Sequence, residues 1–289
     1  MKKILITGLN GFLGSHLASV LSDSNYDVIG LVRRSSDLNR VGKERYRLYF
    51  SDEKYSLDQL FDENEIFAVI HTATIYRAKE TVNELIDTNL KLPVQLMEYV
   101  EKYKVKLFIN TDTFFNNESS NYNYLGNYTL SKKHCIEWLR DIQESCTLVN
   151  MKLHHIYGPY DSDTKFVTNI TKKISEGVES ISLTDCTQKR DFIYISDVCK
   201  AYEKVIDNFS RLKKYSEFEV GTGVSTSVYD FITKIKELSN SSSVLRFGDL
   251  PQREGEPMFN QADVSALEHL GWFPEYSLDE GINELLKSF

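Results

Sequence analysis

The sequence predicts an α/β fold, in which a doubly wound parallel sheet is followed by a smaller mixed α/β part. Short β-rich runs alternate with stretches of helical spacing through the first half of the chain. A glycine-rich turn joins the first run to the first helix, and the alternation ends after His155. We therefore expect a first domain at residues 1–160, with a return segment around 190–215, and a second part at 161–289.

The elements of the first half follow in order along the chain. Strands are expected at residues 4–7, 28–32, 68–71, 107–110 and 147–153, and helices at 12–21, 82–100 and 128–142. Repeated strand–helix–strand steps imply right-handed crossovers and hence parallel strands. Residues 116–123 are rich in Asn and Ser and are expected to form a surface loop. In the second part, residues 158–165 and 239–255 are expected to be irregular.

Composition excludes several classes of protein. The chain has 289 residues, with 34 basic against 42 acidic side chains and a net charge of -8. It has no long Lys or Arg run, so a nucleic-acid surface is not expected, and an anionic substrate would need locally placed arginines. The four cysteines form no C-x-x-C pair, which argues against a zinc site or a disulfide framework and favours a reducing, cytoplasmic location. No apolar run is long enough to span a membrane.

The glycine-rich turn indicates a dinucleotide site. Gly8, Gly11 and Gly14 lie between the first strand and the first helix. Glycine permits a tight turn and a close approach of the backbone to a pyrophosphate, and the helix N-terminus presents free N–H groups to it. The alternative is a glycine-rich turn that only ends the strand and binds no ligand. The position of the three glycines inside a βαβ unit favours a Rossmann-type nucleotide site.

The end of the second strand predicts which dinucleotide binds. A site for NAD would carry Asp or Glu there, whereas this chain has Arg33, Arg34 and Ser35 after Val32. Two arginines and a serine can receive the 2′-phosphate of NADP(H), although a solvated basic turn is the alternative. We therefore expect NADP(H) as the cofactor, with Asp52 near the adenine. The further cofactor contacts are expected at Thr7, Asn10, Phe12, Leu13, Thr72, Ala73, Thr74, Asn89, Tyr128, Lys132 and His155.

A tyrosine and a lysine four positions apart form the candidate catalytic pair. Tyr128 and Lys132 lie on one face of a predicted helix, and a chance surface pair is the alternative. A nearby ammonium and a bound nicotinamide cation would stabilise the phenolate of Tyr128. The preceding strand ends with Thr111 and Thr113, which can hydrogen-bond a substrate oxygen. We expect Thr111 to be the better placed, with Thr113 as a substrate contact.

Taken together, these residues resemble the extended short-chain dehydrogenase family, whose members act on nucleotide sugars. Gly8, Gly11 and Gly14 are similar to its dinucleotide turn, residues 71–74 (HTAT) to its H-x-A-A, Tyr128 with Lys132 to its Y-x-x-x-K, and Thr111 occupies its catalytic Ser/Thr position. The resemblance runs nearly end to end and implies a homodimer built from two helices of the cofactor domain. Later segments that resemble family signatures are YGP at 157–159, KRDFIYISDV at 189–198, REGEP at 253–257 and LGWFP at 270–274.

The resemblance also implies substrate contacts in the second part. Arg190 and Arg253 are candidates for the nucleotide or diphosphate, although each could instead pair with a neighbouring acid, Arg190 with Asp191 or Asp197 and Arg253 with Glu254 or Glu256. The expected substrate contacts are Thr113, His155, Lys165, Arg190 and Arg253. No metal site is expected, because His154 and His155 are adjacent on a strand and point to opposite faces.

Departures from the family pattern narrow the activity. The run Thr111-Asp112-Thr113 lacks the Glu of the sugar-nucleotide dehydratases, which argues against 4,6-dehydration. The segments SKKHCIEWL, HHIYGP and TKFVTNI most resemble the 4-ketoreductases that make CDP-linked 3,6-dideoxyhexoses, such as abequose and paratose synthases. This resemblance implies that NADPH reduces the C4 ketone of the sugar while Tyr128 protonates the alkoxide, Thr111 orients it and Lys132 holds the ribose.

Two alternatives stay open. A nucleotide-sugar 4-epimerase would use NAD and the same Tyr–Lys pair, but Arg33 in place of an acid counts against it. A dinucleotide-sensing regulator that has lost turnover would keep the fold, but the intact Thr111, Tyr128 and Lys132 count against that.

Overall fold

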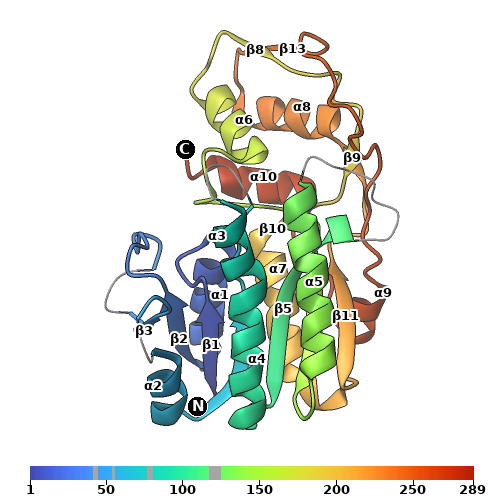
Figure 1. Cartoon of the computed structure of the whole chain (residues 1–289). Coiled ribbons are helices and arrows are strands. Elements are labelled where there is room, and N and C mark those ends of the chain that lie inside the picture. The colour runs from blue at the N-terminus through green and yellow to red at the C-terminus, as the bar shows by residue number, and fades with distance from the viewer. Residues whose placement is uncertain (42–44, 54–55, 77–80, 117–124) are drawn as a thin grey trace. The chain divides into compact units, whose positions relative to one another are not determined.

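The computed structural model describes residues 1–41, 45–53, 56–76, 81–116 and 125–289 (Figure 1). The chain divides into two compact units, of which the first comprises Met1–Glu118, Leu125–Lys152 and Tyr202–Phe218. The second comprises Leu153–Ala201 and Glu219–Phe289. Strand β7 (His155–Tyr157) belongs to this second unit and pairs with β10 (Phe192–Tyr194) rather than with the large sheet. The two units therefore divide after Lys152, while a functional domain boundary near residue 160 stays a prediction.

Within the described residues, the first unit is built on a seven-stranded sheet with the order β11-β6-β5-β4-β1-β2-β3. The bounds are β1 Lys3–Thr7, β2 Asp27–Val32, β3 Arg47–Phe50, β4 Ile66–His71, β5 Leu107–Thr113, β6 Thr147–Leu153 and β11 Tyr215–Val220. Strands β1 to β5 pair in parallel along this order. The predicted parallel doubly wound sheet is confirmed, and β3 is a strand that the sequence analysis did not name.

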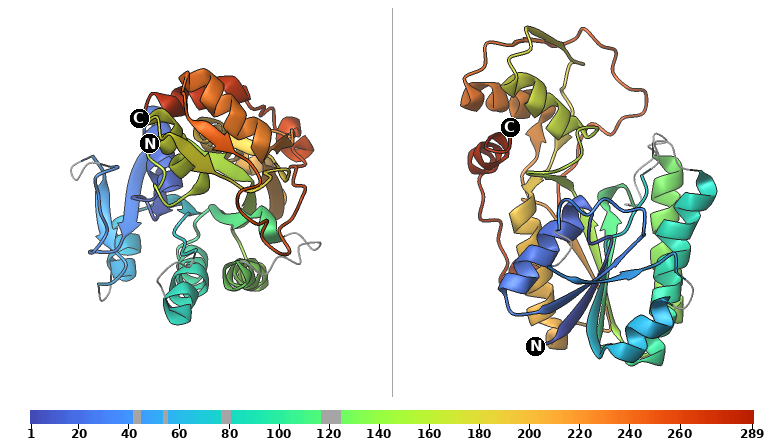
Figure 2. Two further views of the ribbon diagram at one scale, coloured as in Figure 1. Left: turned by 90° about the horizontal axis from the view of Figure 1, so that it is seen from above. Right: turned by 90° about the vertical axis from the view of Figure 1, so that its left-hand side faces the viewer.

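Helices cover both faces of this sheet. The bounds are α1 Phe12–Asp23, α2 Ser56–Glu63, α3 Val82–Ile86, the π-helical turn η1 Asp87–Lys91, α4 Leu92–Lys102, the 3-10 turn η2 Phe114–Asn116, α5 Gly126–Ile142, α7 Ile195–Asp207 and the 3-10 turn η3 Phe209–Arg211. Helices α4 and α5 lie on one face, and α1 lies with α7 on the other (Figure 2). The expected helix at 82–100 is therefore split by a π turn. Of the expected loop at 116–123, only Asn116 is described, and the remainder lies outside the described residues.

The core of the first unit lies between the sheet and helices α4 and α5. Leu5 of β1, Val69 of β4 and Phe108 of β5 are fully buried there, together with Leu96 of α4 and Leu139 of α5. Both helices present apolar residues at helical spacing toward the sheet. This packing fixes α5, and with it the side chains that α5 carries near the end of β5.

The second unit is smaller and combines helices with short strands. Its elements, besides β7 and β10, are α6 Phe166–Ser175, β8 Ser180–Ser182, β9 Lys189–Arg190, β12 Thr226–Ser227, α8 Val228–Ser239, β13 Val244–Arg246, α9 Ser265–His269 and α10 Leu278–Leu286. Strand β13 lies inside the expected irregular segment 239–255, because it pairs with the distant β8, a contact without a local sequence signal. None of the helices that the structure describes is long and apolar enough to cross a membrane.

Two buried aspartates organise the loops of the second unit. The carboxylate of Asp191 accepts hydrogen bonds from the backbone N–H groups of three residues, at 2.7–3.0 Å. The carboxylate of Asp197 accepts from the N–H groups of Glu275 and Tyr276, and the indole of Trp272 donates to its backbone carbonyl. The signature segments at 189–198 and 270–274 therefore hold one another in place.

Candidate active site

The glycine turn forms a cradle beside the ends of β1 and β4. Gly8 has a positive φ of +64°, and a Cβ there would lie 2.7 Å from Cα of Ala73. A Cβ on Gly14 would collide with the carbonyl oxygen of Gly8. Gly11 is the N-cap of α1, and no side chain in the described part of the chain caps this helix terminus. The turn therefore requires glycine and leaves the first N–H groups of α1 open to an anion.

Hydroxyl groups brace this edge of the sheet. The hydroxyl of Thr7 lies 2.9 Å from Nδ1 of His71 and accepts from the N–H of Ala73, and the hydroxyl of Thr72 donates to the carbonyl of Thr7 at 2.7 Å. Asn10 donates to the carbonyl of Asp37, in the loop after β2. Thr7 and Thr72 are thus occupied in holding the strand ends together. Phe12 and Leu13, which are also predicted to contact the cofactor, are the first two residues of α1.

Two arginines follow β2, and their side chains differ in the ion pairs that they form. The guanidinium of Arg34 pairs with Glu53 and lies 4.8 Å from the ring centre of Phe50, while its backbone N–H donates to the carboxylate of Asp52 at 3.0 Å. Arg33 is exposed and forms no ion pair with the residues that the structure describes. The next residue, Ser35, is also exposed. Arg33 is therefore the spare cation at this point.

Tyr128 and Lys132 lie on the buried face of α5, with exposed fractions of 3% and 1%. The ammonium of Lys132 donates to the carbonyl of Thr111 at 2.8 Å. An ammonium has three N–H donors, and this carbonyl is the acceptor that the described residues provide. Burial lowers the pKa of Lys132, against the attraction of Cys135 and Asp112. A buried cation with donors to spare fits the ribose hydroxyls of a dinucleotide.

The hydroxyls of the two threonines of β5 have different partners. The hydroxyl of Thr111 lies 2.8 Å from the hydroxyl of Tyr202 on α7 and is occupied there. The hydroxyl of Thr113 accepts from the N–H of Phe115 at 3.3 Å, and Thr113 lowers the pKa of Tyr128. Residues two apart on a strand share a face, so the sequence alone did not separate them. Thr113 is thus the threonine of β5 that affects the pKa of Tyr128.

The pKa of Tyr128 is raised well above its usual value. Burial is the largest cause, the charges of Tyr76 and Asp112 add to it, and the hydrogen bond from Thr113 opposes it. The sequence predicts that Lys132 and a bound nicotinamide cation stabilise the phenolate, whereas in the protein itself the withdrawal of the phenol from water is the largest effect on this pKa. Tyr128 is therefore protonated throughout the neutral range.

Tyr76 is a neighbour of Tyr128 that the sequence analysis did not single out. The two rings stack with their centres 4.7 Å apart at 29°. Tyr76 lies two residues beyond Thr74, the end of the HTAT segment, and 40% of it is exposed. The sequence signal that could have identified Tyr76 is an aromatic residue two positions after the HTAT segment.

Asn89, in the π-helical turn η1, joins the cofactor edge to the catalytic helix. Its amide exchanges hydrogen bonds with the backbone of Ile75, accepts from the hydroxyl of Thr74 and donates to the hydroxyl of Ser131 on α5. Ser131 in turn donates to the carbonyl of Tyr128. The side chain of Asn89 is fully buried and holds the loop after β4 against α5.

In the second unit, Arg190 is buried and paired. Its guanidinium bonds Glu256 at 2.9 Å and the carbonyls of Pro257 and Lys189 at 2.6 and 2.9 Å. The acid that pairs with Arg190 here is Glu256, while the carboxylates of Asp191 and Asp197 accept backbone N–H groups of distant loops. Two further basic residues of this unit are predicted substrate contacts. Lys165 lies at the start of α6, and Arg253 lies in an exposed loop.

The two adjacent histidines have separate surroundings in the second unit. His154 bonds Asn260 at 2.8 Å and Glu219 at 3.2 Å, while the ring of His155 packs against Phe192. Burial lowers the pKa of His155 well below its usual value, and Arg190 adds to this shift. His155 is therefore neutral near pH 7. Among the described residues, no group of three or more His, Cys, Asp or Glu side chains could hold a metal ion.

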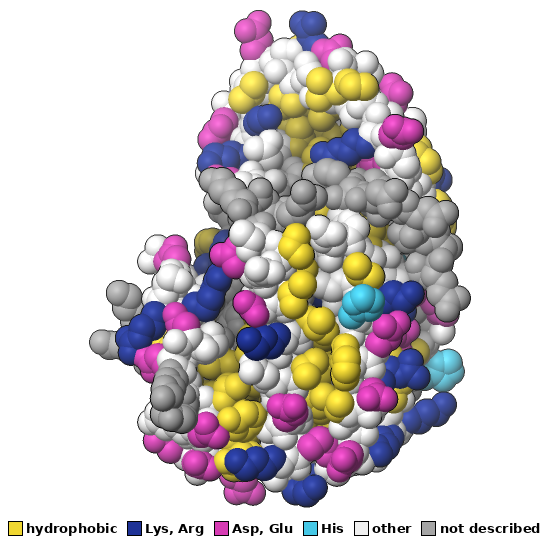
Figure 3. Space-filling model, in the orientation of Figure 1, with side chains coloured by type: hydrophobic (Ala, Val, Ile, Leu, Met, Phe, Trp, Pro, Cys, Tyr) yellow, Lys and Arg dark blue, Asp and Glu magenta, His cyan; other side chains and the backbone are white. Residues whose placement is uncertain are grey.

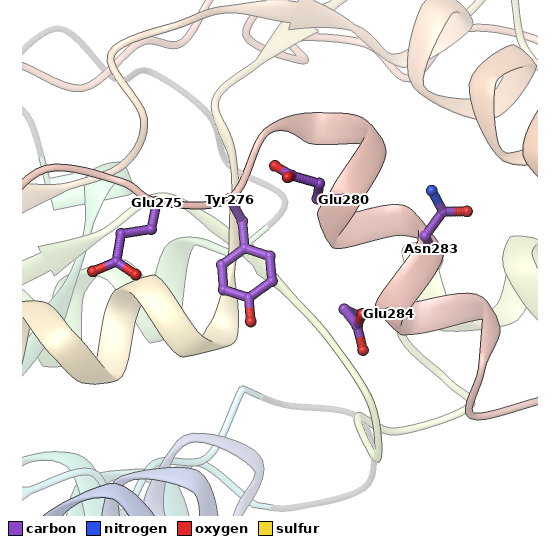
Figure 4. Close-up of a pocket in the computed structure, with 5 residues that line it drawn as sticks. All are labelled: Glu275, Tyr276, Glu280, Asn283 and Glu284. Carbon is purple, nitrogen blue, oxygen red and sulfur yellow. The ribbon is translucent and has the colours of Figure 1, made fainter.

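A separate hollow of about 460 Å³ lies at the start of α10 (Figure 4). The side chains around it are Glu275, Tyr276, Glu280, Asn283 and Glu284. Each carboxylate there already bonds a neighbouring side chain. The hollow contains none of the predicted site residues, and we assign it no part in the chemistry.

Comparisons with known proteins agree with this arrangement. A CDP-abequose synthase of Salmonella typhimurium is 32% identical, over 98% of this chain and 97% of that protein. Another from Salmonella muenchen is 34% identical, over 99% and 97%. The solved UDP-glucose 4-epimerase of Thermotoga maritima with UDP-glucose has a similar fold, with a TM-score of 0.85, 23% identity and coverage of 99% and 98%. Residues 4–221 match the family described as NAD dependent epimerase/dehydratase, and the chain belongs to that family.

Proposed function

We propose that this protein reduces the C4 ketone of a nucleotide-linked deoxysugar with NADPH, in the biosynthesis of surface-polysaccharide sugars. The substrate class is a CDP-4-keto-3,6-dideoxyhexose. The observation that carries the proposal is the buried Tyr128, held protonated beside Thr113 on the face of α5 that also carries Lys132. Likeness to two CDP-abequose synthases over nearly the whole chain supports the sugar and the nucleotide.

The residues of the first unit fit a bound dinucleotide. The pyrophosphate would lie against the turn at Gly8, Gly11 and Gly14, where a Cβ on Gly8 or Gly14 would collide with the backbone. The spare donors of Lys132 would bind the ribose of the nicotinamide half, and Arg33 would bind the 2′-phosphate of NADPH. When bound, NADPH supplies hydride to the carbonyl carbon of the sugar.

The side chains at the end of β5 and on α5 then handle the oxygen and the proton. The hydroxyl of Tyr128 donates a hydrogen bond to the C4 carbonyl oxygen and gives up its proton as that oxygen becomes an alkoxide. We assign the orienting role, expected for Thr111, to Thr113, because Thr111 is held by Tyr202. Lys132 faces the phenolate that remains and stabilises its charge.

The second unit would supply the contacts to the nucleotide. Arg253 is proposed for the diphosphate, because a guanidinium binds phosphate oxygens in pairs. Arg190, which the sequence also predicted for this role, would instead hold the neighbouring loop in place through its bond to Glu256. Lys165 adds a second cation, and a neutral His155 can donate to a sugar hydroxyl or accept from it without a charge.

A homodimer is proposed from the exposed apolar surface of the first unit. Hydrophobic side chains gather over α4 and α5 in Figure 3. Leu130 and Trp138, two turns apart on α5, are 51% and 52% exposed. A patch of this kind commonly marks a protein interface. Light scattering should give twice the chain mass, and Trp138→Glu should give the mass of one chain. The four cysteines are free, which supports a cytoplasmic location.

The first test measures the loss of reduced-nicotinamide absorbance with freshly generated CDP-4-keto-3,6-dideoxyglucose. We expect turnover with NADPH, less with NADH, and a fall of about 10³-fold in kcat for Tyr128→Phe. Because the acid is Tyr128 with a raised pKa, the rate should stay level through neutral pH and fall only in the alkaline range. Interconversion of UDP- or dTDP-hexoses without net NADPH consumption would instead establish an epimerase.

A further inference from the structure

Asp112 is a buried acid that the mechanism above does not use. It lies on β5 between Thr111 and Thr113 and is 2% exposed. Its carboxylate accepts from the backbone N–H of Thr113 at 2.8 Å, from the amide of Asn116 at 3.0 Å and from the amide of Asn150 at 2.9 Å. All three partners are donors, which suits a carboxylate rather than a carboxylic acid, whose O–H would need an acceptor.

Hydrogen bonds across the sheet hold this carboxylate in place. Asn150 lies on the neighbouring strand β6, and its amide oxygen accepts from Asn110 at 2.8 Å. Its amide nitrogen donates to Asp112 and also to Glu217 of β11, at 3.0 Å. Glu217 in turn pairs with Lys152 at 2.7 Å. Asn110 and Asn150 are fully buried, so water does not compete for these bonds. Asp112 is therefore anchored through three adjacent strands.

The same carboxylate closes the turn that follows β5. It bonds the N–H of Thr113, just before the 3-10 turn η2, and the side chain of Asn116, the last residue of η2. Within this turn, the hydroxyl oxygen of Thr113 accepts from the N–H of Phe115 at 3.3 Å. A threonine hydroxyl has one hydrogen and can accept as well as donate. Because the N–H of Phe115 is directed at the oxygen, the hydrogen of this hydroxyl is directed elsewhere and can be donated.

We propose that Asp112 is a positioning residue that acts through Thr113. By holding η2 closed, its carboxylate keeps the hydroxyl of Thr113 oriented as a donor to the reacting oxygen, and Asp112 itself touches neither substrate nor cofactor. This inference rests on the proposed reductase function, in which Thr113 orients the C4 carbonyl oxygen.

The hydrogen bonds of Asp112 require an acid rather than an amide. One carboxylate oxygen accepts from Thr113, and the other accepts from Asn116 and Asn150. An asparagine has a single oxygen, so its NH₂ group would face at least one of these donors. Burial raises the pKa of Asp112, but its three hydrogen bonds oppose that shift.

The kinetic test is a double-mutant cycle of Asp112→Asn and Thr113→Val. For Asp112→Asn we expect kcat to fall by about tenfold, with KM for NADPH within about twofold, because a reacting group is misplaced and no cofactor contact is removed. In the Thr113→Val background the same substitution should change kcat by less than about twofold, since the group through which it acts is already absent. An equal fall in both backgrounds, or no fall in either, would overturn the proposal.

Two further variants complete the cycle. Asn116→Ala removes one hydrogen bond to Asp112 without placing a new group in the sheet, and should lower kcat by about threefold only where Thr113 is present. The matched control is Asp62→Asn, which changes an exposed acid that accepts from the hydroxyl of Tyr103. It should leave kcat unchanged in both backgrounds.

A second measurement does not depend on turnover. Amide hydrogen exchange followed by NMR reports the N–H of Phe115, which donates to the hydroxyl of Thr113. In Asp112→Asn this N–H should exchange about tenfold faster, while the N–H of Phe108, inside β5, should keep its rate. An unchanged rate at Phe115, or an equal rise at Phe108, would overturn the positioning role. Faster exchange at Phe115 alone, in a protein that reduces no ketone, would instead reject the proposed reaction and support the hold of Asp112 on Thr113.

Discussion

Lys132 in the first unit and Arg190 in the second are both buried cations, but their hydrogen bonding differs. Arg190 is neutralised by Glu256 and bonded to two carbonyls, whereas Lys132 has a carbonyl as its acceptor and no carboxylate bonded to it in the described part of the chain. A buried charge is costly unless it is paired. A paired cation holds a fold together, while a cation with unused donors is placed for a ligand. The same contrast separates Arg33 from Arg34.

The largest effect should come from Lys132→Met. Turnover should fall by about 10³-fold, because the ribose contact and the charge beside Tyr128 are both lost. The melting temperature should not fall, since the substitution removes a buried charge that has few protein partners. Steady-state kinetics and thermal unfolding monitored by circular dichroism measure the two effects. A clear drop in melting temperature would show that Lys132, like Arg190, stabilises the fold.

Arg190→Met should have the opposite profile in thermal unfolding. It leaves Glu256 without its partner in a largely buried place, so we expect a loss of about 3 kcal/mol in the free energy of unfolding. Denaturant titration measures this loss. The double variant Arg190→Met with Glu256→Gln should recover part of the stability, and a single variant as stable as the wild type would contradict the structural role.

The two threonines of β5 sharpen the comparison at smaller scale. Thr113→Val should lower kcat by about 10²-fold, because it removes a donor to the developing alkoxide. Thr111→Val should leave kcat within a few-fold and lower stability by about 1 kcal/mol, through loss of the bond to Tyr202. Parallel kinetics and denaturant titration separate the two outcomes. The reverse ranking in kcat would return the catalytic role to Thr111.

The smallest effect concerns cofactor choice. Arg33→Ala should raise KM for NADPH by about tenfold and leave KM for NADH unchanged, as expected for the loss of one charge-assisted bond to a phosphate. Arg34→Ala should change KM for NADPH less, because that guanidinium is bound to Glu53. Equal changes in KM for NADPH and NADH would show that Arg33 does not bind the 2′-phosphate.

The sequence predicted those parts of the molecule that have local signals. The strand, glycine turn and helix at the N-terminus, and the spacing of Tyr128 and Lys132, follow from short-range patterns. The role of Thr111 did not, because its partner Tyr202 lies 91 positions away. Likewise, the partner of Arg190 is not the adjacent Asp191 but Glu256, which a loop brings back. The sequence identifies side chains whose chemistry suits a site. It does not identify their hydrogen-bond partners, because those partners are brought close only by the fold.

The amide of Asn89 has a consequence for how binding events communicate. It bonds the backbone of Ile75 at the cofactor edge and the hydroxyl of Ser131 in the turn that carries Tyr128. A ligand that shifts one of these segments therefore alters the free energy of the other, and by thermodynamic reciprocity each ligand changes the affinity for the other by the same factor. For the proposed function, we therefore expect the affinities for dinucleotide and sugar to be coupled through Asn89.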